Sequence, residues 1–422
     1  MVNLLLSKCP PSVMISPPVD LVGRTPLGVM LKSPEPSARK QKRELSVALF
    51  SPGDVSIFGQ ARPVEDRIVV DHDIQLRYGI ADMPGRRIDM EDAICQGQLV
   101  LADQKCHLLG VFDGHGDGGL VSKFLAENIV GFLEGQSSKF LDLQDQGAMQ
   151  LAWESVCLGL DARLKKEELA GGSTACMALV SKHQIIVANI GDSRAILVES
   201  DSSCPDPPKL LSEFPENVAA NEQSRGAQGA ATTQTVEESK PKEIKIVVKP
   251  LSQDHKPDVE SEKKRAELAG VEVFEESFLE NGETVTIHKF SMSEKNRVAF
   301  SRSFGDYDYK AKEELPPEKQ AVIAVPELQF HRRNDTTDRF LVICCDGVFD
   351  VMSNDEVGQF VVDQAKLGKE LPLIGDALVR ACFEKGSGDN MSVIIADLNA
   401  CKDIEHPHLL EGKALDFSSP TK

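Results

Sequence analysis

Residues 108–116 are LLGVFDGHG. The first five form an apolar run that predicts a short buried strand, and the polar residues follow where that strand opens into a loop. The carboxylate of Asp113 and the backbone carbonyl of Gly114 are hard oxygen ligands, which Mg²⁺ and Mn²⁺ prefer. His115 can hold or deliver a proton near neutral pH. Taken alone, this segment fits either a catalytic metal site or an Asp-Gly turn beside a surface histidine.

Three more acidic clusters occur along the chain. Glu91 and Asp92 form the first, Asp346 follows the apolar run at 340–345, and Asp389 lies just before the apolar run at 391–396. A charged group beside a hydrophobic run is costly unless it is paired or bound to metal. Several such carboxylates at strand edges in one domain predict that they converge on a pair of cations.

These motifs, in this order, resemble the metal-dependent protein phosphatase family, the type 2C serine/threonine phosphatases. The resemblance covers roughly residues 75–400, which is about one large catalytic domain. Further matches in the family's order lie at 78–79, 85–93, 172–175, 188–195, 254–257 and 301–306.

The pattern of apolar runs predicts an α+β fold. Many strands are interrupted by helix pairs without regular βαβ alternation, which favours antiparallel sheets with helices on their outer faces. The resemblance implies a more definite architecture, a four-layer antiparallel β-sandwich flanked by helices on both faces. The expected strands are 74–80, 174–180, 184–190, 194–198 and 244–248, and the expected helices are 120–133, 148–169, 262–269, 354–365 and 373–384. Ser353 and Glu356 have the spacing of a capping box at the start of the fourth helix.

The resemblance also implies a chemistry. The family hydrolyses phosphoserine and phosphothreonine with a water activated between two divalent ions, Mg²⁺ or Mn²⁺. It assigns Asp113 as the bridge between the two ions and Gly114 as a carbonyl ligand. Asp346 and Asp389 are implied as direct ligands of one ion. Glu91 is implied to act at the other ion, directly or through water, and Asp92 to help hold a metal-bound water. If Glu91 and Asp92 lie on a strand, their side chains point to opposite faces.

Four further residues receive roles from the same resemblance. Arg87 aligns with the arginine that binds the substrate phosphate, although it is also compatible with an ordinary surface arginine. His115 aligns with the general acid that protonates the leaving oxygen. Asp192 and Asp350 are expected to hold a third, weaker metal ion, or else to be structural carboxylates that pair with Arg194 or a turn amide.

The chain divides into four expected parts. Residues 1–70 are predicted to be a flexible Pro/Ser-rich tail with a basic cluster, and residues 401–422 a short C-terminal tail. Residues 71–400 are predicted to form the catalytic domain, with a disordered insertion at 200–242. A long acidic flap at about 274–294, with a hairpin turn at Asn281-Gly282, departs from the family pattern, so substrate specificity is not inherited.

Composition limits the partners. A formal charge of −19 argues against general nucleic-acid binding, because phosphate contacts need a basic footprint. No apolar run approaches the ~20 residues of a membrane span. Ten cysteines without a CxxC pair favour a reducing compartment, so the expectation is an intracellular protein, cytoplasmic and/or nuclear. Phosphoproteins are the expected substrates and a monomer the expected state.

Two rival functions remain open at this point. One is a pseudophosphatase that keeps the fold but acts as a binding or scaffold protein. The other is a two-metal phosphohydrolase acting on small phosphoesters or nucleotides, although the sequence contains no GxxxxGK[ST] loop. Metal-dependent turnover of phosphopeptides distinguishes both rivals from a protein phosphatase.

Overall fold

The computed structural model describes residues 67–200 and 245–399, apart from 281–282 and 294–295. Residues 1–66 of the predicted N-terminal tail, the insertion from 201, the hairpin turn at Asn281-Gly282 and the C-terminal tail lie outside the described residues. The predicted end of the flexible tail at residue 70 was wrong, because Ile68–Asp71 form a strand.

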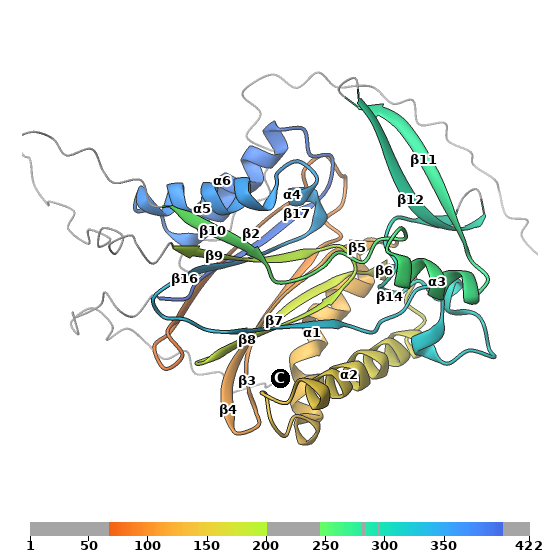
Figure 1. The fold of residues 1–422 in the computed structure, drawn as a ribbon, viewed down its shortest axis with the longest axis horizontal. Helices are drawn as coiled ribbons and strands as arrows, with labels where there is room; N and C mark the ends of the chain where they lie inside the picture. The colour runs from red at the N-terminus through yellow and green to blue at the C-terminus, as the bar shows by residue number, and fades with distance from the viewer. Residues whose placement is uncertain (1–66, 201–244, 281–282, 294–295, 400–422) are drawn as a thin grey trace, which may run out of the picture. The chain divides into compact units, whose positions relative to one another are not determined.

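Two antiparallel sheets form the centre of the fold (Figure 1). The six-stranded sheet has the order β1 (Ile68–Asp71), β2 (Leu76–Met83), β17 (Met391–Asp397), β16 (Asp338–Cys344), β9 (Arg194–Ser200) and β10 (Ile246–Pro250). The five-stranded sheet has the order β15 (Glu327–Arg332), β8 (Gln184–Ile190), β7 (Ala175–Ser181), β4 (Gln104–Phe112) and β3 (Ala93–Leu101).

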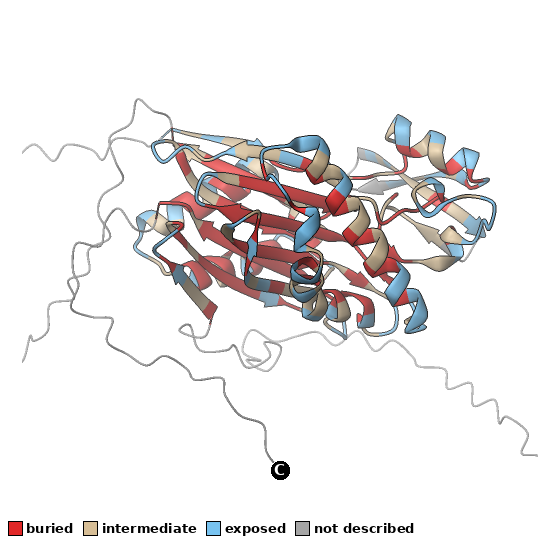
Figure 2. Ribbon diagram, turned by 90° about the horizontal axis from the view of Figure 1, so that it is seen from below, coloured by how far each residue is buried: buried red, intermediate tan, exposed pale blue. Residues whose placement is uncertain are grey.

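The two sheets pack face to face. Leu109 and Val111 of β4 share one buried cluster with Ile343 of β16 and Ile394 of β17, so the inner layer is built from alternate residues of both sheets. Seven of the nine residues of β4 are buried, because this strand is covered on both faces. Figure 2 shows the buried residues concentrated along the stacked strands.

Helices cover both outer faces, as Figure 1 shows. The helices α1 (Leu120–Gly135) and α2 (Gln146–Lys166) pack on the five-stranded sheet, and Trp153 of α2 is fully buried in the cluster that they share with its strands. The helices α4 (Asp346–Phe349), α5 (Asn354–Lys366) and α6 (Leu371–Glu384) cover the six-stranded sheet. The predicted four-layer α+β sandwich is therefore confirmed.

Local signals explain where two helices begin and end. The α5 helix starts with the predicted capping box, in which the Ser353 side chain accepts from the backbone N–H of Glu356 and the Glu356 side chain accepts from that of Ser353. The predicted end of α2 at residue 169 was wrong, because the helix stops at Lys166. Glu168 already has a left-handed φ of 54°, so the chain has left the helix before it reaches Gly171.

A smaller substructure extends beside the sandwich. It contains α3 (Glu260–Leu268) and a three-stranded sheet of β11 (Glu272–Glu280), β12 (Glu283–Ser293) and β13 (Asn296–Val298), which is the predicted flap (Figure 1). A second small sheet joins β5 (Gly114–His115), β6 (Gly172–Ser173) and β14 (Phe304–Gly305). Short 3-10 turns occupy Ser137–Lys139, Tyr307–Lys310 and Pro317–Lys319. Within the described part of the chain, no helix is both long and apolar enough to cross a membrane.

Candidate active site

The acidic clusters meet at one end of the sandwich. Asp113 follows β4 of one sheet, and Asp346 opens α4 directly after β16 of the other sheet. Ligand atoms of Asp92, Asp113 and Cys345 all lie within 4.8 Å of one another. Asp389 belongs to the same centre, since its Cβ lies against Gly347, the residue after Asp346, and its charge acts on the buried Asp92. The structure therefore brings these carboxylates together, and their convergence on a pair of cations stays a prediction.

Burial and neighbouring negative charges shift the pKa values of the carboxylates in this centre. Burial, followed by the negative charges of Asp346 and Asp92, raises the pKa of Asp113 well above its ordinary value. Burial and the charge of Asp192 likewise raise the pKa of Asp346. Burial raises the pKa of Asp92 to about 7, and its Oδ2 atom is buried without a hydrogen-bond partner. Divalent ions, which prefer oxygen ligands, fit this set of donors because they would neutralise the mutual repulsion.

Asn390 ties the separate acidic segments together. Its Oδ1 accepts from the backbone N–H of Glu91 at 2.8 Å, and its Nδ2 donates to the carbonyls of Pro84 and Asp89 at 2.9 and 3.0 Å. Asn390 is itself buried next to Asp389. The side chain therefore fixes the loop before β3 against the loop before β17. Glu91 and Asp92 both precede β3, with Asp92 buried and Glu91 half-buried.

Close packing explains why position 114 is occupied by glycine. A Cβ there would collide with the carbonyl oxygen of Glu91 and with the Ser122 hydroxyl, which donates to that same carbonyl. Glycine thus lets the segments carrying Asp113 and Glu91 approach each other. Thr174 holds Asp113 from the other side, since its N–H donates to the Asp113 carbonyl at 2.9 Å.

Arg87 lies at the mouth of the centre. Its Nη2 is 2.6 Å from Oδ2 of Asp389, and 53% of its side chain is exposed. Gly85 has a φ of +61°, and a Cβ there would collide with the Asp389 carbonyl, so the loop approaches Asp389 only with glycine at this position. The predicted phosphate-binding arginine is therefore beside the predicted metal ligands, with a solvent-facing guanidinium.

His115 is oriented by Asp306, a residue of the 301–306 motif to which sequence reasoning gave no role. The Nε2–H of His115 donates to Asp306 Oδ1 at 2.8 Å, and Ser303 Oγ donates to Asp306 Oδ2 at 2.5 Å. Burial lowers the pKa of His115, but the hydrogen bond and charge of Asp306 outweigh it, so the pKa lies above its ordinary value. A Cβ at Gly172 would collide with both side chains, so glycine makes room for the pair.

Asp192 and Asp350 differ in their surroundings. Asp192 is buried and pairs with the ammonium of Lys256, whereas Asp350 is exposed at the end of α4. Arg194 pairs with Asp254 at 2.7 Å, so the alternative in which Arg194 holds Asp192 does not match the contacts. Both carboxylates still act electrostatically on Asp346.

The comparisons with known proteins agree with this geometry. The family model described as protein phosphatase 2C matches residues 76–225 and 237–391. The chain belongs to the protein phosphatase 2C family.

Individual relatives extend the comparison. Protein phosphatase 2C homolog 2 of Hypocrea jecorina is 32% identical over 340 residues, covering 76% of this chain and 62% of that protein. Human protein phosphatase 1A is 27% identical over 330 residues, covering 76% of this chain and 70% of that protein. The chain thus spans less than two thirds of the length of the Hypocrea relative. A phosphatase structure from Toxoplasma gondii shares the fold, with a TM-score of 0.56, 22% identity, and coverage of 79% of this chain and 95% of that one.

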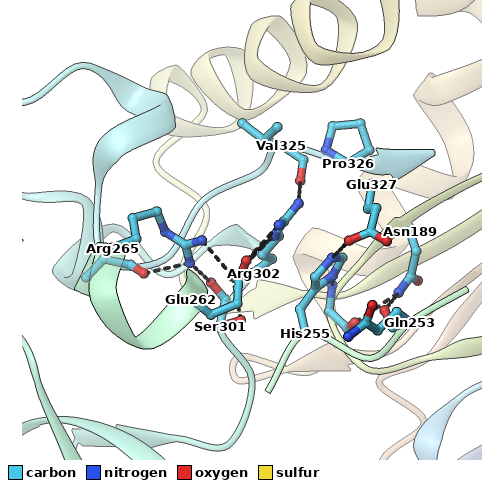
Figure 3. Close-up of polar contacts among 12 residues, drawn as sticks. Asn189, Gln253, His255, Glu262, Arg265, Ser301, Arg302, Val325, Pro326 and Glu327 are labelled. Carbon is cyan, nitrogen blue, oxygen red and sulfur yellow. Dashed lines mark hydrogen bonds and ion pairs between the residues drawn. The ribbon is translucent and has the colours of Figure 1, made fainter. Parts of the chain in front are cut away.

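In this protein phosphatase 2C member, a buried polar network joins helix α3 to Ser301 and Arg302 (Figure 3). The carboxylate of Glu262 on α3 accepts from Arg265 and Arg302, each at 2.6 Å, and from Ser301 Oγ at 2.7 Å. Arg302 also donates to the Val325 carbonyl at 3.0 Å. Because Arg302 lies four residues before Asp306, the network anchors the segment that orients His115. Buried polar residues of this kind carry no periodic signal in the sequence.

Proposed function

We propose that this chain is a metal-dependent protein serine/threonine phosphatase that hydrolyses phosphoserine and phosphothreonine by direct attack of water. The observation that carries the proposal is the convergence of Asp92, Asp113, Asp346 and Asp389 at one end of the sandwich, next to Arg87 and His115. Membership of the protein phosphatase 2C family supports the same reaction.

The carboxylates would hold the cations. The proposed ligand set for two ions, Mg²⁺ or Mn²⁺, consists of Asp113, Asp346, Asp389, the carbonyl of Gly114, and the carboxylates of Glu91 and Asp92. Such ions, when bound, supply charge neutralisation for the phosphate oxygens and a lowered pKa for an attacking water. The raised pKa values of Asp113 and Asp346 support this assignment, because a bound cation would offset both the burial and the repulsion that raise them.

Arg87 would bind the phosphate and His115 would supply the proton. The planar guanidinium of Arg87 suits bidentate contact with two phosphate oxygens. His115 would donate a proton to the departing serine or threonine oxygen, and its raised pKa keeps that proton in place near neutral pH. Asp306 fixes the ring through Nε2, so Nδ1 is the atom that would face the leaving group.

The proposal extends to substrate and compartment. Phosphoproteins are the proposed substrates, in keeping with the family name. A reducing, intracellular location is proposed because the cysteines of the described ranges are all free and buried.

The test is hydrolysis of a phosphothreonine peptide and of a nucleoside triphosphate by the purified chain, with Mn²⁺ and with excess EDTA. The wild type should release phosphate from the peptide only with Mn²⁺, and Asp113→Ala should abolish release while the circular dichroism spectrum is retained. Asp117→Asn, an exposed carboxylate on the same loop, is the matched control and should remain active.

Two results would overturn the proposal. Turnover of the nucleotide but not the peptide would indicate a small-molecule phosphohydrolase. No turnover of either by folded wild type would indicate a pseudophosphatase.

A further inference from the structure

An ammonium group lies inside the acidic centre. Nζ of Lys256 pairs with Oδ2 of Asp192, whose side chain is only 4% exposed. The charges of Asp346 and Asp254 also favour the ammonium form, and Lys256 in turn acts on Asp350. One positive side chain of this protein thus already occupies the region where Asp192 and Asp350 would accept a third cation.

Hydrogen bonds hold together the two segments that carry Asp192 and Lys256. The backbone N–H of Gly191 donates to Nδ1 of His255 at 3.2 Å, and the backbone N–H of His255 donates to the Gly191 carbonyl at 2.9 Å. Asn189 Nδ2 donates to the carbonyls of Gly191 and Gln253 at 3.1 and 2.9 Å. Figure 3 shows His255 between Glu327 and the Asn189–Gln253 pair. These bonds hold the segment before Asp192 beside the segment before Lys256.

The Lys256 side chain can nevertheless leave its ion pair with Asp192. This side chain is 36% exposed, whereas that of Asp192 is 4% exposed. On either side of Asp192, Gly191 is hydrogen-bonded to His255 and Ser193 to Thr174. A lysine ammonium on a flexible four-carbon stem can leave toward water at a modest cost in rotamer freedom. A divalent ion that uses Asp192 must therefore displace Lys256 first.

We propose that Lys256 is a resident cation that competes with a third divalent ion for Asp192 and so keeps that third site weak. The inference rests on the proposed metal-dependent function, and it assigns Lys256 a positioning role rather than a catalytic one. Occupancy of the third site is then set by the exchange of one cation for another on a single carboxylate.

The experiment counts bound Mn²⁺ by electron paramagnetic resonance, titrating the wild type, Lys256→Met and Asp192→Asn without substrate. In Lys256→Met the weakest class of bound Mn²⁺ should tighten by roughly tenfold or more, because a neighbouring positive charge has been removed. Asp192→Asn should lose that class, and the double variant should show no tightening. Lys264→Met, which removes an exposed lysine on α3, should match the wild type.

The outcomes separate this inference from the proposed function. Unchanged or weaker binding of the weakest class in Lys256→Met, with the tight class intact, overturns the role of Lys256. Absence of tight Mn²⁺ binding in the wild type overturns the proposed function instead. If Lys256→Met does not fold, Lys256→Gln removes the same charge with a polar side chain, and the same tightening is expected.

Discussion

Replacing Glu262 by glutamine should destabilise the protein by roughly 3 kcal/mol at pH 7. The carboxylate is 2% exposed and lies between Arg265 and Arg302. Burial raises its pKa, but the hydrogen bond and charge of Arg302 and the charge of Arg265 outweigh this and bring the pKa from 4.5 to about 2. That shift corresponds to roughly 3 kcal/mol at 1.36 kcal/mol per pKa unit. Removing one partner from a buried ion pair costs about 3 to 5 kcal/mol, which agrees.

The stabilisation by the Glu262 carboxylate should depend on pH. A carboxyl whose pKa is lowered by folding stabilises the folded state above its unfolded pKa, and that contribution is lost as pH falls through the folded pKa. The stability difference between wild type and Glu262→Gln should therefore be complete at pH 7 and shrink between pH 4.5 and about 2.

Urea unfolding followed by circular dichroism measures this difference at each pH. Glu260→Gln, an exposed carboxylate on the same helix, is the control and should change stability by less than about 0.5 kcal/mol. A loss below about 1 kcal/mol for Glu262→Gln at pH 7, or a difference that does not vary with pH, would refute the account of this network.

Three other predictions concern the site. Asp306→Asn should slow phosphopeptide hydrolysis by about tenfold or more and move the alkaline limb of the kcat profile to lower pH, because His115 loses the partner that raises its pKa. Hydrolysis of an aryl phosphate, whose leaving group needs no proton, should be much less affected. An equal loss of rate on both substrates would contradict the role of Asp306. Arg87→Ala should raise KM for the phosphopeptide while leaving Tm within the error of the measurement, since its pair with Asp389 is exposed; a large fall in Tm would show a structural role instead. In EDTA the wild type should lose stability as pH rises from about 4 to about 7, because folding raises the pKa of Asp92 and so disfavours its charged form. Scanning fluorimetry should show Asp92→Asn to be more stable than the wild type above pH 7. A lower Tm for Asp92→Asn than for the wild type would contradict this prediction.

Much of the fold was predictable because it depends on local patterns. The apolar run of β4, the helical spacing of α1 and the capping box of Ser353 each carry their signal within a few residues. The end of α2 was missed, since the left-handed turn at Glu168 has no glycine to mark it.

The site was predictable only in part. Asp113, Asp346 and Asp389 stand out because carboxylates beside apolar runs are costly. The partners that position them do not stand out. Asn390 and Asp306 act through hydrogen bonds to residues about 300 and 191 positions away, and no spacing rule connects such distant segments. Lys256 likewise meets Asp192 only because the fold brings β8 and the segment after β10 together.

The most direct test of the central claim is phosphothreonine-peptide turnover as a function of free Mn²⁺, compared between the wild type and Asp346→Asn. The account predicts no wild-type turnover in EDTA, a rise with Mn²⁺, and a variant that stays folded but is inactive or needs far more Mn²⁺. Wild-type turnover in EDTA, or the same Mn²⁺ dependence in both proteins, would contradict it.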